Sequence, residues 1–191
     1  MPILQLENSK TYTDIRDIAE QLAPLQIQIK RLPLGNKQYL PQLLRQDTLS
    51  RDEKEFILSA FDDYFAELKR NAGCKWRELT LLHPGSPYLY ALITQFDRCH
   101  THTDDEALYI LSGECVFGFV LPNGRQMEII LHPEDYINIP AGIEHWLRPT
   151  ASLHWKAVRY FMSVDGWIPQ YTDTEIHFRP TVAKKYPSDC A

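Results

Sequence analysis

Residues 100–106 read HTHTDDE, and this stretch decides how the rest of the chain is interpreted. On a β-strand, His100 and His102 project from the same face, roughly 6.6 Å apart along the backbone. Glu106 follows a short polar turn and opens the next predicted strand, so its carboxylate can return to the same point. Farther along, His145 follows a tight turn between two alternating segments. We therefore predict a metal site formed by His100, His102, Glu106 and His145.

The predicted ligand set consists of three imidazoles and one carboxylate. Nitrogen and oxygen ligands suit Fe(II), Ni(II), Mn(II) or Zn(II), and a six-coordinate ion keeps positions open for a chelating substrate. A structural zinc is disfavoured because no thiolate takes part. The remaining histidines are expected to be surface or hydrogen-bonded core residues; they are His83, His132, His154 and His177.

Strand patterns surround these residues from Trp76 to about residue 165. Segments with period-two alternation are separated by turn residues, which is typical of a closed antiparallel barrel or a sandwich. The run Pro122-Asn123-Gly124 predicts a hairpin with a type I′ turn. The predicted strands cover residues 76–82, 88–102, 106–111, 115–121, 125–131, 136–139, 145–148 and 153–163.

Two helices are predicted before the barrel. The first is capped by Thr13, has apolar residues at three- and four-residue spacing, and stops at Pro24. The second begins with a capping box made by Ser50 and Glu53 and continues as one apolar stripe to Gly73. This stripe is expected to pack on the sheet.

The composition fits one globular domain of 191 residues, with 44% hydrophobic and 24% charged residues. We expect an N-terminal elaboration, residues 1–75, with a strand at 25–32, to pack on a barrel formed by residues 76–180. The net charge of −5 offers no basic stripe for nucleic acid or an anionic membrane.

The cellular compartment is suggested by the cysteines and the N-terminus. Residues 1–10 have neither a basic nor an apolar region of a secretory signal, and no apolar run approaches a membrane span. The cysteines are far apart and form no Cys-x-x-Cys pair, so we expect reduced thiols. We expect a cytoplasmic monomer. The cysteines are Cys74, Cys99, Cys115 and Cys190.

The metal-site residues also carry a family resemblance. The pattern HxHxxxE followed by PxGxxH resembles the two motifs of the cupin superfamily. The fuller runs resemble acireductone dioxygenases, over a region from about Ile15 to Phe178. This resemblance implies a mainly β fold with flanking helices, the double-stranded β-helix or jelly-roll barrel of the cupins. The runs are HTHTDDE, PAGIEHW, AVRYF and GWIPQYT, at residues 100–106, 140–146, 157–161 and 166–172.

The resemblance implies an activity in methionine salvage. Enzymes of this family hold a metal that an enediol substrate chelates through its oxygens, and O2 cleaves the carbon chain. With Fe(II) the products are formate and the keto acid precursor of methionine, whereas Ni(II) leads to release of CO. We expect one divalent metal, Fe(II) first and Ni(II) as the alternative, with a small-molecule substrate and O2 as the partners.

The family resemblance also suggests which residues meet the substrate. Arg159 matches the family's second pocket arginine, and we expect it to be catalytic. At the position of the first pocket arginine, two residues after the ligand glutamate, this chain has Leu108. By strand parity Leu108 points into the barrel, and loss of one charge-assisted contact costs about 2–3 kcal/mol. Arg98 shares parity with His100 and is a candidate to replace the missing cation. The expected pocket residues are Phe96, Arg98, Leu108, Phe161 and Trp167.

Three functions therefore stay open. The leading one is an acireductone dioxygenase, or a close relative with altered substrate preference. The second is a cupin dioxygenase for another chelating enol, such as a β-diketone, which would explain Leu108 by a less charged substrate. The third is a non-catalytic cupin that binds a small molecule.

Overall fold

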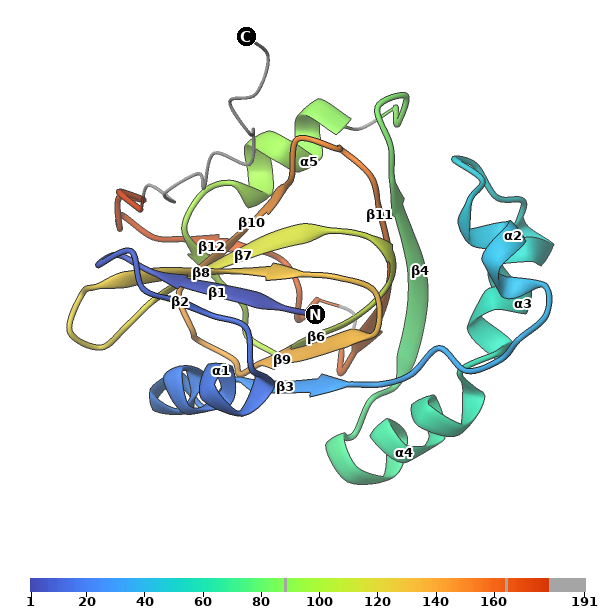
Figure 1. The fold of residues 1–191 in the computed structure, drawn as a ribbon, viewed down its shortest axis with the longest axis horizontal. Helices are drawn as coiled ribbons and strands as arrows, with labels where there is room; N and C mark the ends of the chain where they lie inside the picture. The colour runs from blue at the N-terminus through green and yellow to red at the C-terminus, as the bar shows by residue number, and fades with distance from the viewer. Residues whose placement is uncertain (88, 164, 179–191) are drawn as a thin grey trace, which may run out of the picture.

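Two antiparallel β-sheets face each other across an apolar interior (Figure 1). The structure is a computed structural model, and it describes residues 1–87, 89–163 and 165–178. One sheet has seven strands in the order β12-β5-β10-β7-β8-β1-β2, and the other has five in the order β3-β9-β6-β11-β4. The predicted mainly β barrel is confirmed. The strands are β1 (Ile3–Leu6), β2 (Thr11–Tyr12), β3 (Gln28–Arg31), β4 (Trp76–Leu82), β5 (His100–Thr101), β6 (Glu106–Gly113), β7 (Cys115–Val120), β8 (Gln126–Leu131), β9 (Asp135–Ile139), β10 (His145–Pro149), β11 (Trp155–Phe161) and β12 (Gln170–Tyr171).

Alternation along the strands of the smaller sheet divides the apolar side chains between two cores. On β6, Leu108 and Ile110 enter the interior between the sheets, whereas Tyr109 enters a second core on the outer face. On β11, Ala157 and Tyr160 divide in the same way. The outer core is covered by three helices that lie beside β4 in Figure 1. These helices are α2 (Leu40–Leu44), α3 (Arg51–Ser59) and α4 (Asp62–Ala72).

The predicted helix from Ser50 to Gly73 is correct at both ends but is broken in the middle. The capping box forms, because Glu53 N–H donates to Ser50 Oγ at 3.2 Å and Ser50 N–H donates to the Glu53 carboxylate at 2.8 Å. Gly73 ends α4 with a φ of 70°. Phe61 interrupts the helix with a φ of −122° and a ψ of 25°, and its ring meets Tyr109 edge-on at 5.3 Å.

The N-terminal region contributes strands as well as helices to the barrel. β1 pairs with β8, and β3 forms one edge of the smaller sheet by pairing with β9. Between them lie α1 (Ile15–Leu22) and the 3-10 helix η1 (Ala23–Leu25). The cap of α1 is Asp14 rather than the predicted Thr13, since Asp14 accepts from Arg16 N–H at 2.8 Å. The predicted strand 25–32 is shortened to β3, because η1 and Gln26, with a φ of 56°, precede it.

The predicted strand over residues 88–102 is largely wrong. Residues 89–96 form α5 (Leu89–Phe96), and only β5 remains of the strand. Leu89, Ile93 and Phe96 also fit the i, i+4, i+7 spacing of a helix, so the apolar run was ambiguous. Thr94 accommodates the helix by donating to the carbonyl of Tyr90 at 2.9 Å. Strand parity therefore does not apply to residues 96 and 98.

The hairpin between β7 and β8 is confirmed, but its turn is not of type I′. Gly124 has a φ of 78°, whereas Asn123 is not among the described residues with positive φ. Leu121 N–H donates to Arg125 O, and Gly124 N–H donates to Leu121 O, both at 2.8 Å. Pro122 favours a longer connection because its ring fixes φ near −65°.

A close contact between two strands fixes the start of β10. Gly118 on β7 lies opposite Trp146, and a Cβ at this glycine would lie 1.8 Å from the indole. Trp146 is fully buried and donates from its indole N–H to Glu128 at 2.9 Å. This packing anchors the residue that follows His145.

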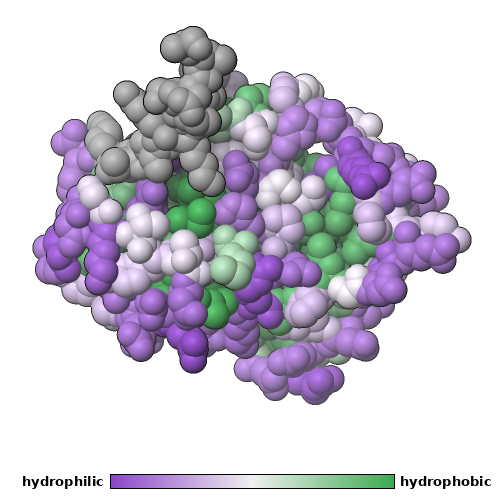
Figure 2. All heavy atoms as spheres, viewed as in Figure 1, coloured by the Kyte–Doolittle hydropathy of each residue, from purple (hydrophilic) through white to green (hydrophobic). Residues whose placement is uncertain are grey.

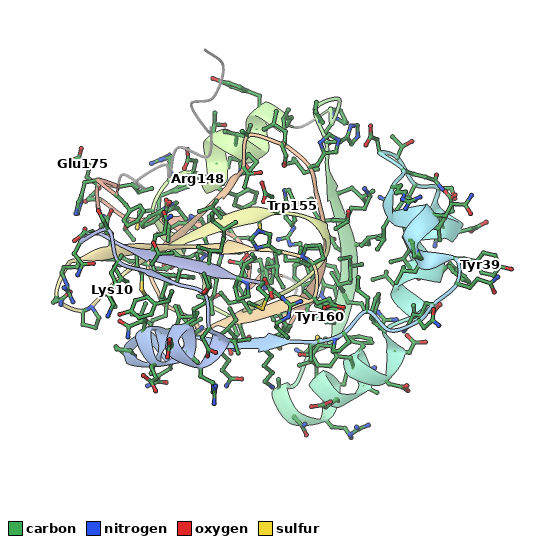
Figure 3. The ribbon with its side chains drawn as sticks, viewed as in Figure 1. Lys10, Tyr39, Arg148, Trp155, Tyr160 and Glu175 are labelled. Atoms are coloured by element: carbon green, nitrogen blue, oxygen red, sulfur yellow. The ribbon has the colours of Figure 1, made fainter. Side chains whose placement is uncertain are left out.

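The exterior is mostly polar on the face shown in Figure 2. Trp155 lies among the barrel side chains in Figure 3, whereas Tyr39 lies at the periphery and is 61% exposed. Within the described residues, no helix is long and apolar enough to cross a membrane. Three cysteines, Cys74, Cys99 and Cys115, are buried free thiols; Cys190 and the last two residues of the predicted barrel, 179 and 180, lie outside the described residues.

Candidate metal centre

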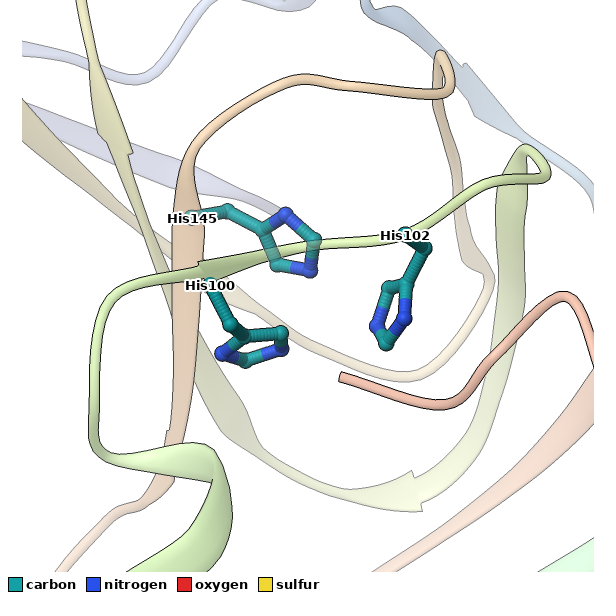
Figure 4. Close-up of side chains that lie close together, drawn as sticks. All are labelled: His100, His102 and His145. Atoms are coloured by element: carbon teal, nitrogen blue, oxygen red, sulfur yellow. The ribbon is translucent and has the colours of Figure 1, made fainter. Parts of the chain in front are cut away.

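Three buried imidazoles lie close together (Figure 4). His100 lies on β5 opposite His145, the first residue of β10, and His102 follows two residues later. One ring nitrogen from each lies within 4.8 Å of the others. All three side chains are buried, with exposed fractions of 1%, 4% and 1% for His100, His102 and His145. The histidines far apart in the sequence are thus brought together by the β5–β10 pairing.

Glu106, the first residue of β6, completes the group from the facing sheet. Its carboxylate lies 2.9 Å from His145 Nε2 and 3.3 Å from His102 Nε2. Burial alone would raise the pKa of Glu106, but hydrogen bonds with His102 and His145 outweigh it and hold the pKa well below its usual range. The carboxylate is therefore ionised at neutral pH.

The backbone fixes the orientation of two imidazoles. His100 Nδ1 lies 2.6 Å from the carbonyl of Arg98, and His145 Nδ1 lies 2.8 Å from the carbonyl of Ile143. Because a carbonyl only accepts, each Nδ1 carries a proton; His100 Nε2 therefore keeps a free lone pair, whereas His145 Nε2 faces the Glu106 carboxylate. Burial, assisted by the neighbouring His145, lowers the pKa of His100 to about 4, so this ring is neutral at pH 7.

These features fit a divalent cation. Metal ligation needs neutral imidazoles and deprotonated carboxylates, with the second ring nitrogen held by a carbonyl or a carboxylate. His102 Nδ1 is buried and has no hydrogen-bond partner among the described residues. The other histidines with ion-pair partners lie elsewhere: His132 faces Glu114, His154 faces Asp47 and His177 faces Glu7.

A cavity of about 30 Å³ is lined in part by Glu106. Phe96 from α5, Leu108 from β6 and Arg159 from β11 lie on its wall. The rest of the wall is mainly apolar, with Thr80 as a polar exception. Arg159 is the one cation on this wall among the described residues.

Arg159 is held by aromatic rings and a carboxylate. Its guanidinium lies 4.3 Å from the ring centre of Trp167 and 5.0 Å from that of Phe161. Its Nη1 is 3.4 Å from the Glu78 carboxylate. Trp167 also stacks on His102 with a ring distance of 6.1 Å. Phe161 and Trp167 therefore contact Arg159, but they are not among the residues that line the cavity.

Arg98 does not enter the cavity, so the hypothesis that it replaces the missing cation is wrong. Its side chain is exposed, and its guanidinium lies 4.0 Å from the ring centre of Tyr171. The physical reason is local: residue 98 lies between α5 and β5, where strand parity does not set side-chain direction.

Some wall residues were missed in the sequence. Leu147 lies two residues after His145 on β10 and could have been found by parity. Ile93 could not, because its segment was interpreted as a strand. Thr80 and Leu82 come from β4, where alternation was visible but nothing in the sequence showed which strand adjoined the site.

The two facing sheets have the cupin fold, and the three histidines with Glu106 form a candidate metal centre between them. The chain belongs to the acireductone dioxygenase family, since the ARD/ARD′ family model matches residues 5–169. This is a family of oxygenases that use O2.

Relatives support this assignment over nearly the whole chain. The acireductone dioxygenase of Trichodesmium erythraeum is 50% identical over 94% of this chain and 99% of its own length. That of Microcystis aeruginosa is 48% identical over 93% and 97%, respectively. A solved structure, "Acireductone dioxygenase from Bacillus anthracis with cadmium ion in active center", has a TM-score of 0.84 at 24% identity and covers 90% of this chain and 98% of that one. This structural likeness shows the fold.

Proposed function

We propose that this protein is a metal-dependent dioxygenase that cleaves an acireductone, an enediol, with O2 in methionine salvage. The observation that carries the proposal is the convergence of three buried imidazoles beside the ionised Glu106 carboxylate. His100, His102, Glu106 and His145 are the proposed ligands of one divalent metal, Fe(II) first and Ni(II) as the alternative. Family membership supports the substrate class.

The protein's own residues bind and orient the substrate. A divalent ion at this centre would act as template and Lewis acid for an enediol that chelates it. Arg159 offers a planar cation to the anionic substrate, and Trp167 and Phe161 keep its guanidinium in place. The apolar wall formed by Phe96 and Leu108 excludes water around the reacting carbons.

The test is turnover with defined metal content. Metal-free protein is loaded with Fe(II) or Ni(II) without oxygen, mixed with acireductone, and then exposed to O2. The Fe(II) protein is expected to consume the enediol, measured as loss of its absorbance, and to release formate. The Ni(II) protein is expected to release CO. His145→Ala should abolish both, whereas His154→Ala, which changes a half-buried histidine paired with Asp47, should leave them unchanged. Metal-loaded protein that leaves acireductone intact would contradict the proposal.

A second substrate class is favoured by Leu108, which makes the cavity wall more apolar. A cupin dioxygenase for a β-diketone would need fewer cations than one for an enediolate. Turnover of a β-diketone without turnover of acireductone would identify this function. A protein that takes up no metal under any condition would contradict both enzyme functions and leave the non-catalytic small-molecule binder as the remaining alternative.

The setting of the enzyme completes the proposal. We propose a single domain over residues 1–191 that acts as a monomer on a small molecule and O2. The free thiols of Cys74, Cys99 and Cys115 support the proposed cytoplasmic location, because a reducing compartment keeps thiols free. Size-exclusion chromatography with light scattering tests the monomer.

A further inference from the structure

In the sequence, Asp105 lies between the proposed ligands His102 and Glu106. Its side chain, however, contacts β9 and the turn before His145. Its carboxylate accepts from Asn138 Nδ2 at 3.1 Å and from the backbone N–H of Ala141 at 3.0 Å. Asn138 is near the end of β9, and Ala141 is in the turn that precedes His145. One carboxylate therefore ties the segment with His102 and Glu106 to the segment that delivers His145.

Two further hydrogen bonds hold the same region together. The N–H of Gly142 donates to the carbonyl of His102 at 2.9 Å, and the indole N–H of Trp167 donates to the carbonyl of Asp105 at 3.2 Å. Figure 4 shows the two ligand-bearing segments, with His102 on one and His145 on the other. The side chain of Asp105 joins them at the turn before His145.

The strand pairing near the site is too short to fix His102. β5 ends at Thr101, and its pairing with β10 joins only His100 and His145. His102 lies beyond this ladder and is followed by a turn. A metal site must hold its ligands to within about 0.5 Å, so these residues need support from outside the sheet.

We infer that Asp105 is a positioning residue of the metal centre, which clasps the turn before His145 to the segment that carries His102 and Glu106. This inference rests on the proposed function, because it assumes that these residues hold a metal. Asp105 acts through Asn138 and the backbone of Ala141.

The hydrogen bond between Asp105 and Asn138 can be tested by exchanging the two residues. Asn138→Asp places a second carboxylate against Asp105, so a hydrogen bond becomes a repulsion. Asp105→Asn alone is milder, because Asn138 can rotate its amide and accept from the new Asn, whose oxygen still accepts from Ala141 N–H. The double variant Asp105→Asn/Asn138→Asp restores one donor facing one carboxylate, with the charge on the opposite side.

The experiment measures Ni(II) affinity by chelator competition for the full chain and for these variants. Asn138→Asp and Asp105→Ala are expected to weaken Ni(II) binding at least about tenfold, as for other residues that support metal ligands. The double variant should return to within about twofold of the parent. The absorption spectrum of Co(II)-loaded protein should change in Asn138→Asp and recover in the double variant.

A matched control comes from another aspartate that also accepts from a backbone N–H. Asp14 caps α1 in this way, far along the chain from the ligands, and Asp14→Ala should leave the Ni(II) affinity unchanged. The thermal midpoint of each metal-free variant is measured alongside, and the exchange keeps the test valid if Asp105→Ala does not fold.

The outcomes distinguish failure of the proposed positioning role of Asp105 from failure of the proposed metal centre. Parent-like Ni(II) affinity in Asn138→Asp, or failure of the exchange to restore binding, would overturn the clasp while leaving the metal centre intact. Absence of Ni(II) binding by the parent protein would overturn the proposed metal centre, and the clasp with it.

Discussion

Leu108 and Arg159 lie directly opposite each other in the ladder between β6 and β11. Both side chains reach the wall of the cavity beside Glu106. The two strands thus present one apolar side chain and one guanidinium, side by side, to this cavity. Cross-strand neighbours are close enough for two like charges to repel. This pairing makes position 108 the sharpest probe of substrate preference.

Leu108→Arg is expected to strengthen binding of an anionic enediol and to destabilise the substrate-free protein. A second charge-assisted contact contributes about 1.5–3 kcal/mol, which should lower the KM for acireductone roughly tenfold or more. Without substrate, the new cation is buried opposite Arg159, and the free energy of unfolding should fall by about 2 kcal/mol. Steady-state kinetics and urea unfolding measure both effects. An unchanged or raised KM would show that the pocket does not recognise the anion at this position.

The sequence predicted the site better where strand parity was valid. Glu106 and Leu108 share a face of β6, and both reach the same cavity, as alternation required. The pairing of His100 with His145 is a long-range contact that no local pattern specifies, yet the residue types and their strand context were sufficient to expect it. The roles of these residues remain predictions.

The errors arose where an apolar run fitted two periodicities. The segment Leu89–Phe96 forms a helix, so Phe96 reaches the cavity from α5 and Arg98 lies outside it. The break at Phe61 and the contacts of Asp105 were also hidden, because they depend on which distant side chains lie nearby. Local spacing carries no information about such partners.

Arg159→Met is expected to impair substrate binding without removing the metal. The guanidinium contacts Glu78, Trp167 and Phe161, and its loss should raise the KM for acireductone about tenfold to a hundredfold. Bound metal, measured by elemental analysis, should stay at the parent level. The control is Arg77→Met, which removes a similar stacked arginine, over Phe65, on the outer side of the sheet. Equal effects of the two variants on KM would contradict a substrate role for Arg159.

The stability of the metal-free protein should fall at acidic pH because of His100. Burial and the nearby His145 lower the pKa of His100 from 6.5 to about 4, so between these values the unfolded chain binds more protons than the folded one. The stability present above pH 6.5 is therefore lost as the pH falls toward 4, by about 3 kcal/mol in total.

The measurement for His100 is urea unfolding of the metal-free protein across this pH range. In His100→Gln, the loss of stability between pH 6.5 and 4 should be smaller by about 3 kcal/mol, because the neutral amide does not titrate. Parallel pH curves for the parent and the variant would show that the pKa of His100 is the same in the folded and the unfolded protein.

Removing the hydroxyl groups of two tyrosines in the outer core should change the free energy of unfolding in opposite directions. Tyr109 donates to the carbonyl of Leu32 at 2.7 Å, whereas the buried hydroxyl of Tyr160 has no hydrogen-bond partner among the described residues. Tyr109→Phe leaves a carbonyl without its donor and should cost about 1 kcal/mol. Tyr160→Phe removes an unpaired polar group from an apolar site and should stabilise the fold by about 1 kcal/mol. Urea unfolding of the metal-free protein at pH 7 measures both.

Because both rings pack in the same core, each variant is the control for the other. A destabilised Tyr160→Phe would mean that this hydroxyl is hydrogen-bonded in solution.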